Sequence, residues 1–175
     1  MRTLRVLLAL AISSLLLSAC ASMPKAKPGL YVNREHRFSV DYPTSWQGQP
    51  LQGDEVLRAA NPTQFKLPVV TAAVAPRRQG ASLDPRAFMA VMQQRIAGSS
   101  DFKLLSQEDL ALNDSTPAKA FTFEWLWADK TTRLVTAALI AIKNGNFYNA
   151  TATNISGGSP PPDQLLAIVR SWKFY

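Results

Sequence analysis

The segment from residue 120 to residue 153 constrains the fold most strongly, because its pattern predicts three successive strands of an antiparallel sheet. Residues 120–127 read AFTFEWLW, an alternation that places four aromatic side chains on one face of a strand. Residues 132–143 are apolar on both faces, which indicates a central strand covered on both sides. The dipeptide Asn144-Gly145 is a strong hairpin signal, and residues 147–153 supply the returning strand.

Two helices are predicted, one before this meander and one after it. Asp84 is placed to cap the first helix, with Pro85 in its first turn, and Gly98 ends it. The second helix spans residues 162–171, close to the end of the sequence. Further strands are expected at residues 37–42, 55–60, 67–75 and 102–112. This order of elements predicts an α+β fold with one central helix and one C-terminal helix.

The first 20 residues have the layout of a secretory signal peptide. Arg2 and Arg5 precede a largely apolar core of twelve residues at positions 6–17, and small residues follow. Twelve helical residues extend about 18 Å, which is too short for a bilayer core of roughly 30 Å. We therefore expect residues 1–19 to be a cleaved signal peptide and not a permanent transmembrane helix.

The end of this segment, Leu17-Ser18-Ala19-Cys20, resembles the bacterial lipobox at all four positions. The resemblance implies cleavage between Ala19 and Cys20, a diacylglycerol on the Cys20 sulfur, and an acyl chain such as palmitate on the new amine. Two or more chains anchor a protein stably, whereas one does not. Ala21 follows the cysteine in place of aspartate, which resembles the pattern of outer-membrane lipoproteins in a Gram-negative cell. The alternative is an ordinary signal peptide with a chance cysteine.

Residues 20–28 link the lipidation site to the remainder of the chain. The stretch ASMPKAKP at 21–28 has two prolines, two lysines and no apolar period, so it predicts an extended tether of roughly 25 Å. Lys25 and Lys27 either touch anionic lipid or are only solvated. Residues 29–175 contain no repeat and no second linker, and they predict a single domain.

Three features within residues 30–175 carry a family resemblance: the opening YVNREHRFSVDYPTSW, a helix followed by a long meander, and the ending LLAIVRSWKFY. Together they resemble the PsbP-like superfamily, which includes the extrinsic photosystem II protein and DcrB-like bacterial envelope lipoproteins. The resemblance implies an α/β/α sandwich around a twisted, mainly antiparallel sheet. It also implies a non-catalytic protein that docks on a larger partner, and it assigns no binding residues.

The chain offers little for catalysis. It has one cysteine and one histidine, so zinc sites built on several such ligands are excluded, and no metal or cofactor is expected. The sequence contains no Gly-x-Ser-x-Gly, Gly-rich phosphate loop or HExxH motif. A Ser-His-Asp hydrolase would have to use His36, which is expected at an exposed strand start. We therefore expect no catalytic residues and no enzyme activity.

Two stretches are candidates for a binding surface. Trp125 and Trp127 close the aromatic row and are expected to be partly exposed, although the row as a whole also fits core packing. Arg77 and Arg78 form a basic loop that either meets an anionic surface or is only solvated. Export argues against a nucleic-acid partner despite the net charge of +7.

The sequence thus predicts a cell-envelope lipoprotein, held on the membrane by lipid on Cys20, and facing the periplasm if the cell is Gram-negative. Its expected role is that of a non-catalytic accessory module for a larger envelope complex. One alternative is a carrier or sensor of a small apolar or lipidic ligand, which requires a cavity between sheet and helix. Another is a hydrolase of envelope material, which requires catalytic groups around His36.

Overall fold

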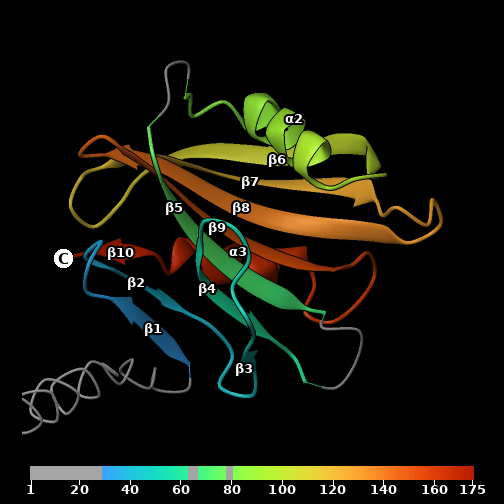
Figure 1. Cartoon of the computed structure of the whole chain (residues 1–175), viewed down its shortest axis with the longest axis horizontal. Helices are drawn as coiled ribbons and strands as arrows, with labels where there is room; N and C mark the ends of the chain where they lie inside the picture. Colours follow the sequence, from blue (N-terminus) through green and yellow to red (C-terminus); the bar gives the residue numbers. More distant parts are fainter. Residues whose placement is uncertain (1–28, 63–66, 78–80) are drawn as a thin grey trace, which may run out of the picture.

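The computed structural model describes residues 29–62, 67–77 and 81–175, and a seven-stranded sheet forms its centre (Figure 1). All neighbouring strands in this main sheet run antiparallel, which confirms the predicted type of sheet. In spatial order the strands are β3 (Gln47–Gly48), β4 (Glu55–Ala60), β5 (Val69–Pro76), β9 (Asn146–Ile155), β8 (Arg133–Lys143), β7 (Pro117–Leu126) and β6 (Ser100–Ala111).

The predicted meander forms strands β7, β8 and β9. In its register Phe121 lies opposite Ala138, which in turn lies opposite Thr151. Strand β8 is buried from Leu134 to Ala141, as its apolar character on both faces predicts. Asn144 and Gly145 have φ angles of 49° and 75°, the positive values that a tight two-residue hairpin of type I′ requires. The hairpin prediction is therefore confirmed.

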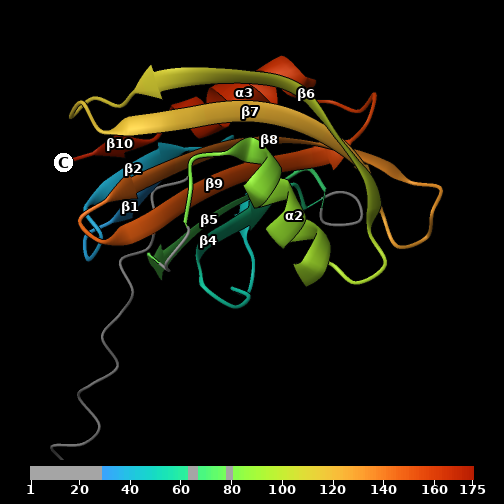
Figure 2. The ribbon, with the colours of Figure 1, turned by 90° about the horizontal axis from the view of Figure 1, so that it is seen from above.

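Helices α2 (Pro85–Arg95) and α3 (Pro162–Arg170) cover opposite faces of the main sheet (Figure 2). This arrangement confirms the expected α/β/α sandwich. The carboxylate of Asp84 accepts a hydrogen bond from the Arg86 backbone N–H at 2.9 Å, so the predicted N-cap is also confirmed. Helix α2 ends at Arg95, and Gly98, with a φ of 82°, shapes the turn that leads into β6.

A second, three-stranded sheet lies on the α3 side of the main sheet. It consists of β1 (Leu30–Asn33), β2 (Phe38–Asp41) and β10 (Lys173–Phe174), with β2 in the middle. Phe174 pairs with Phe38 at one end of this small sheet. The sequence predicts the strand that becomes β2. It does not predict that residues 173–174 pair with this strand, because two residues are too few to show a strand pattern.

The larger core fills the space between the main sheet, α3 and the small sheet. The rings of Phe38 and Trp172 stack with centroids 3.9 Å apart, and Tyr148 meets Phe174 edge-on at 4.9 Å. Leu165 of α3 is fully buried in this core. The chain ends of residues 29–175 therefore converge on one face of the main sheet.

The smaller core lies between α2 and the opposite face of the main sheet. Phe88 of α2 meets Phe121 edge-on with centroids 5.5 Å apart. Met89 is the α2 residue that is buried in this core, at 7% exposure, and Met92 of the same helix packs against it. The buried members of this cluster are Met89, Phe121, Phe123, Trp125, Leu134, Ala138 and Ile140.

Candidate functional site

Three of the predicted site residues, Ala19, Cys20 and Arg78, lie outside the described residues. Signal cleavage, lipidation and the tether at residues 20–28 therefore stay predictions. Within the described part of the chain, no helix is both long enough and apolar enough to cross a membrane.

The aromatic row of β7 belongs to the core along most of its length. Trp125 is 2% exposed, and its indole N–H donates to the hydroxyl of Thr136 at 3.0 Å. Phe102 of β6 stacks on its ring with centroids 5.5 Å apart. The expectation that Trp125 forms part of a surface is therefore wrong, because a neighbouring ring covers it and its one polar group is satisfied internally. Trp127 lies just beyond the end of β7 and remains 44% exposed.

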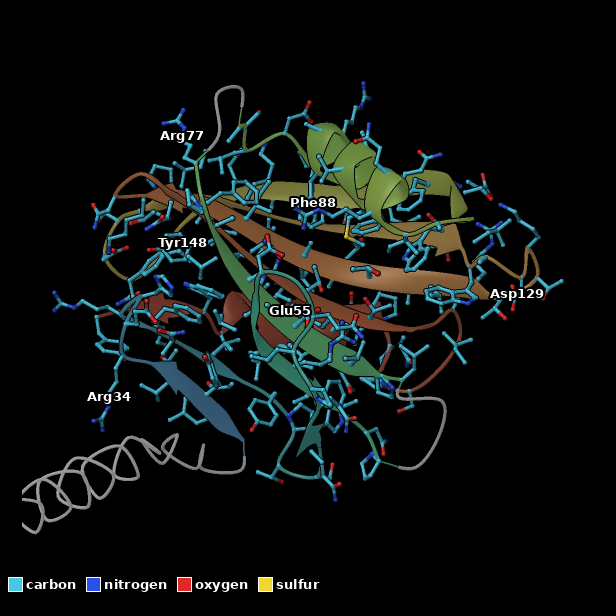
Figure 3. The ribbon with its side chains drawn as sticks, in the orientation of Figure 1. Arg34, Glu55, Arg77, Phe88, Asp129 and Tyr148 are labelled. Carbon is cyan, nitrogen blue, oxygen red and sulfur yellow. The ribbon has the colours of Figure 1, made fainter. Side chains whose placement is uncertain are left out.

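Arg77 and Trp127 do not share a surface, because they lie at opposite ends of the main sheet. The Arg77 backbone N–H donates to the carbonyl of Gly145 at 2.8 Å, in the turn after β8. The Trp127 backbone N–H donates to the carbonyl of Thr132 at 2.9 Å, just before β8 begins. Figure 3 shows Arg77 and Asp129, which is in the same loop as Trp127, at opposite ends of the molecule.

His36 lies in the turn between β1 and β2 and is half-buried. Its ring meets Tyr148 edge-on, with centroids 6.4 Å apart at an angle of 83°. The carbonyl oxygen of the Asn33 side chain accepts its backbone N–H at 2.8 Å, which fixes the turn. The single histidine is thus packed against a ring and does not stand at an exposed strand start.

A hollow of about 220 Å³ opens beside His36, and we call it the hairpin-end hollow. It forms where the β1–β2 turn, the β8–β9 hairpin and Tyr175 meet, at the end of the molecule where Figure 3 labels Tyr148. The rings of His36, Tyr148 and Tyr175 line it together with the charged and amide groups of Arg37, Lys143 and Asn146, and Glu35 and Asn144 complete its rim.

Hydrogen bonds between residues far apart in the sequence fix the shape of the hollow. The phenol of Tyr175 donates to the carbonyl of Asn33 at 2.9 Å, and the Tyr175 backbone N–H donates to the carbonyl of Arg37 at 3.1 Å. These bonds tie the last residue described to both ends of the β1–β2 turn. Tyr175 is nevertheless 52% exposed.

One cation of the hollow is fixed by its neighbours. Lys143 forms an ion pair with Asp114, and its ammonium lies 4.2 Å from the centroid of the Phe174 ring. Burial alone would raise the pKa of Asp114, but hydrogen bonds from Lys143 and Thr116 outweigh burial and hold that pKa at about 2. The carboxylate therefore stays ionised, and the Lys143 charge is held in place.

The hairpin-end hollow is lined by aromatic rings and by charged and amide groups. None of the eight described residues that line it is Ser, Thr or Cys, so His36 has no serine, threonine or cysteine side chain beside it in this hollow. Over the described ranges, no three His, Cys, Asp or Glu side chains come close enough together to hold a metal ion. What the hollow offers is ring faces, one ion-paired ammonium, a guanidinium and amides.

A second hollow, of about 500 Å³, lies between the start of α2 and strands β6 and β7. Its walls include the ion pair of Lys119 with Asp109, at 3.0 Å, and the capping residue Asp84. Both hollows are therefore lined largely by polar groups, and neither favours the hypothesis of an apolar ligand carrier.

Sequence reasoning missed most of the hollow. It used Asn144 only as part of a turn signal and Tyr175 only as part of the family resemblance. Tyr148 reads as one residue of a returning strand. The residues meet only because β10 pairs with β2 and brings Tyr175 beside the β8–β9 hairpin. His36 is the one residue of the hollow that the sequence marks as a candidate, and it marks it for catalysis.

Comparisons with known proteins identify the fold. No family model and no curated protein matches this sequence. The structure is similar to the solution structure of cyanobacterial PsbP (CyanoP) from Synechocystis sp. PCC 6803, with a TM-score of 0.64 and 13% sequence identity over 91% of this chain and 99% of that one. A crystal structure from Bacteroides thetaiotaomicron matches with a TM-score of 0.51 and 11% identity over 85% of this chain and 49% of that one. The chain therefore has a PsbP-like fold, as the resemblance implied.

Proposed function

We propose that this protein is a lipid-anchored module of the bacterial cell envelope that binds a larger protein partner and catalyses no reaction. Lipid on Cys20 holds it on the membrane, at the periplasmic side of the outer membrane in a Gram-negative cell. Cleavage after Ala19 leaves a short tether before the PsbP-like domain at residues 29–175. The lipobox and the two arginines of the signal peptide support the anchor.

The observation that carries the binding role is the composition of the hairpin-end hollow. Tyrosine and arginine, together with tryptophan, are enriched among the residues that contribute most to protein–protein binding energy, and Tyr148, Tyr175 and Arg37 meet here. A volume of about 220 Å³ suits a side chain or a short turn of a partner. Pockets for drug-sized ligands are larger, roughly 300–1,000 Å³, and mostly apolar.

The fold is compatible with this proposal but does not supply it. PsbP-like proteins share an architecture, and a shared architecture does not transfer a partner. The resemblance to that superfamily implies docking on larger assemblies. A hollow lined by tyrosine and arginine, which are common in protein–protein interfaces, is consistent with such a role.

The proposal is tested by co-purification from detergent-solubilised membranes after chemical cross-linking of the full-length protein. Tyr175→Ala and Arg37→Gln should each lower recovery of the cross-linked partner several-fold. Leu105→Ala and Arg86→Gln are matched controls, since both change exposed residues remote from the hollow. Melting curves for all four variants establish that the fold is retained. Recovery that is equal in all variants, or no cross-linked protein partner in the parent, would contradict the proposal.

A further inference from the structure

The small sheet has an outer face that no other described element covers. Leu30 and Val32 of β1 are 36% and 40% exposed on this face, while Tyr31 between them points toward the core. Ser39 lies opposite Val32, and Lys173 lies opposite Ser39, so both also point outward. Two exposed aliphatic side chains therefore stand beside a lysine on one side of the molecule.

The position of the chain's exit limits which faces can approach a membrane. The carbonyl of Gly29 accepts the Tyr42 backbone N–H at 3.0 Å, so the chain is fixed to the small sheet from that residue onward. The nine residues that precede Gly29, from Cys20 to Pro28, extend roughly 28 Å at about 3.1 Å per residue. A domain of the size of residues 29–175 has a radius of gyration of about 15 Å and is nearly 40 Å across.

A tether shorter than the body cannot bring the far side of the body to the membrane. Figure 1 shows β1 on one side of the main sheet and α2 on the other. The outer face of the small sheet lies beside the exit, whereas α2 lies across the full thickness of the molecule. Among the exposed apolar residues described, Leu30 and Val32 are thus the ones that the anchor brings nearest to the lipid.

The charges on this side complement an anionic surface. The exposed side chains of Arg34, Arg37 and Lys173 form no ion pair with any described acid. Figure 3 shows Arg34 pointing away from the body on the side of β1. The small sheet and its β1–β2 turn carry two acids and three basic residues, so cations are in excess there. The acids are Glu35 and Asp41, and the cations are Arg34, Arg37 and Lys173.

We propose that the outer face of the small sheet lies against the anionic phospholipid headgroups of the membrane that holds the anchor. Leu30 and Val32 reach the boundary between headgroups and acyl chains, and Arg34 reaches the lipid phosphates. This inference rests on the proposed function, because it requires lipid on Cys20. It adds an orientation: the domain sits on the membrane by one defined face.

The test uses the full-length protein purified from bacterial membranes, with single cysteines introduced at matched positions. Val32→Cys is the reporter and Val91→Cys, on the outward side of α2, is the control, since Val32 and Val91 are 40% and 46% exposed. Each is labelled with a thiol-reactive fluorophore and reconstituted into phosphatidylcholine vesicles with or without phosphatidylglycerol. A nitroxide on lipid headgroups then quenches fluorophores that lie near the membrane surface.

In vesicles with phosphatidylglycerol, we expect quenching at position 32 to exceed quenching at position 91 several-fold. Added salt and Arg34→Gln should each reduce the difference, because both weaken attraction to the anionic lipid. Leu30→Cys is a second reporter in case Val32→Cys disturbs the fold. Equal quenching at positions 32 and 91 would overturn the inference. Fluorophore self-quenching that increases with protein density and does not depend on the lipid composition would overturn it as well.

The parent protein separates this failure from failure of the proposed function. Its only cysteine is Cys20, so a lipidated parent cannot react with the fluorophore. A parent that labels stoichiometrically has a free thiol at position 20, which contradicts the anchor itself. A parent that does not label, with equal quenching at the two valine positions, keeps the anchor and contradicts the orientation.

Discussion

The two faces of the main sheet are covered in different ways. On the α3 face, a helix and a second sheet enclose a large apolar core in which Phe38 and Trp172 are almost fully buried. On the α2 face, one helix covers the aromatic side chains of β7. Further along that face, threonine hydroxyls pair with each other, Thr71 with Thr151 at 2.8 Å and Thr136 with Thr153 at 2.9 Å.

The α3-side core therefore contributes most to holding the fold together, and the α2 side forms a more peripheral layer. The α3 face receives the first and last described elements, so its core joins residues far apart in sequence. The hairpin-end hollow and the exit of the tether belong to the same side. We therefore expect substitutions on the α3 face to affect both stability and binding, and substitutions on the α2 face to affect stability alone.

The largest expected effect tests the two cores against each other with the same substitution. Phe38→Ala removes a fully buried ring that stacks on Trp172, and should lower the free energy of unfolding by about 3–5 kcal/mol. Phe88→Ala removes a half-buried ring of α2 and should cost roughly 2 kcal/mol. Urea unfolding of both variants measures the difference, and equal losses would contradict the distinction between the faces.

A smaller effect is expected from the two tryptophans of the aromatic row. Trp125→Phe removes the N–H that donates to Thr136 in the α2-side core, and should cost about 1 kcal/mol of unfolding free energy. Trp127→Phe changes a side chain that is 44% exposed and should alter stability by less than about 0.5 kcal/mol. Should Trp127→Phe prove the more damaging change by chemical denaturation, the assignment of Trp125 to the core would be wrong.

The caps of the two helices give a further comparison. Asp84→Ala removes the side chain that accepts the Arg86 N–H at the start of α2, and should cost about 1 kcal/mol. Helix α3 has no side-chain cap at its N-cap residue, Pro161, and Asp163 in its first turn contributes only through its charge. Asp163→Ala should therefore cost less than Asp84→Ala in thermal unfolding, and the opposite order would contradict this account of the helix ends.

The smallest expected effect concerns acid. The pKa of Asp114 is held at about 2 despite burial, and hydrogen bonds from Thr132 and Thr131 lower the pKa of Asp129 to about 2 as well. The usual pKa of an aspartate carboxyl is 3.8. A carboxyl whose pKa is lowered on folding stabilises the protein at pH values above 3.8, and this contribution is lost as the pH falls from 3.8 toward 2. The urea midpoint should fall across that window, and less steeply in Asp114→Asn. An identical slope in the variant would remove Asp114 from the explanation.

Local patterns in the sequence account for the parts of the fold that depend on neighbours. Alternation in AFTFEWLW gives β7, the Asn144-Gly145 dipeptide gives the hairpin, and Asp84 gives the start of α2. Alternation reports which face a side chain occupies, but not what covers that face. The pattern puts Trp125 and Trp127 on one face, but β7 ends at Leu126, so Trp125 lies under Phe102 while Trp127 lies beyond the strand and is exposed.

Contacts between distant segments could not be read from the sequence. Strand β10 has two residues, too few to carry a strand pattern, and it forms because Phe174 pairs with Phe38. The hairpin-end hollow depends on that pairing, since it brings Tyr175 beside Tyr148. Residues with ordinary local roles thus become a candidate site only after the chain has closed on itself.

The central claim is that this domain works while attached to a membrane through Cys20. Intact-mass measurement of the full-length protein, extracted from bacterial membranes, tests it most directly. The account predicts a chain that begins at residue 20 and carries the added mass of a diacylglycerol, with or without a further acyl chain on the new amine. A chain of unmodified mass, whether uncleaved or cleaved at another position and recovered from the soluble fraction, would contradict it.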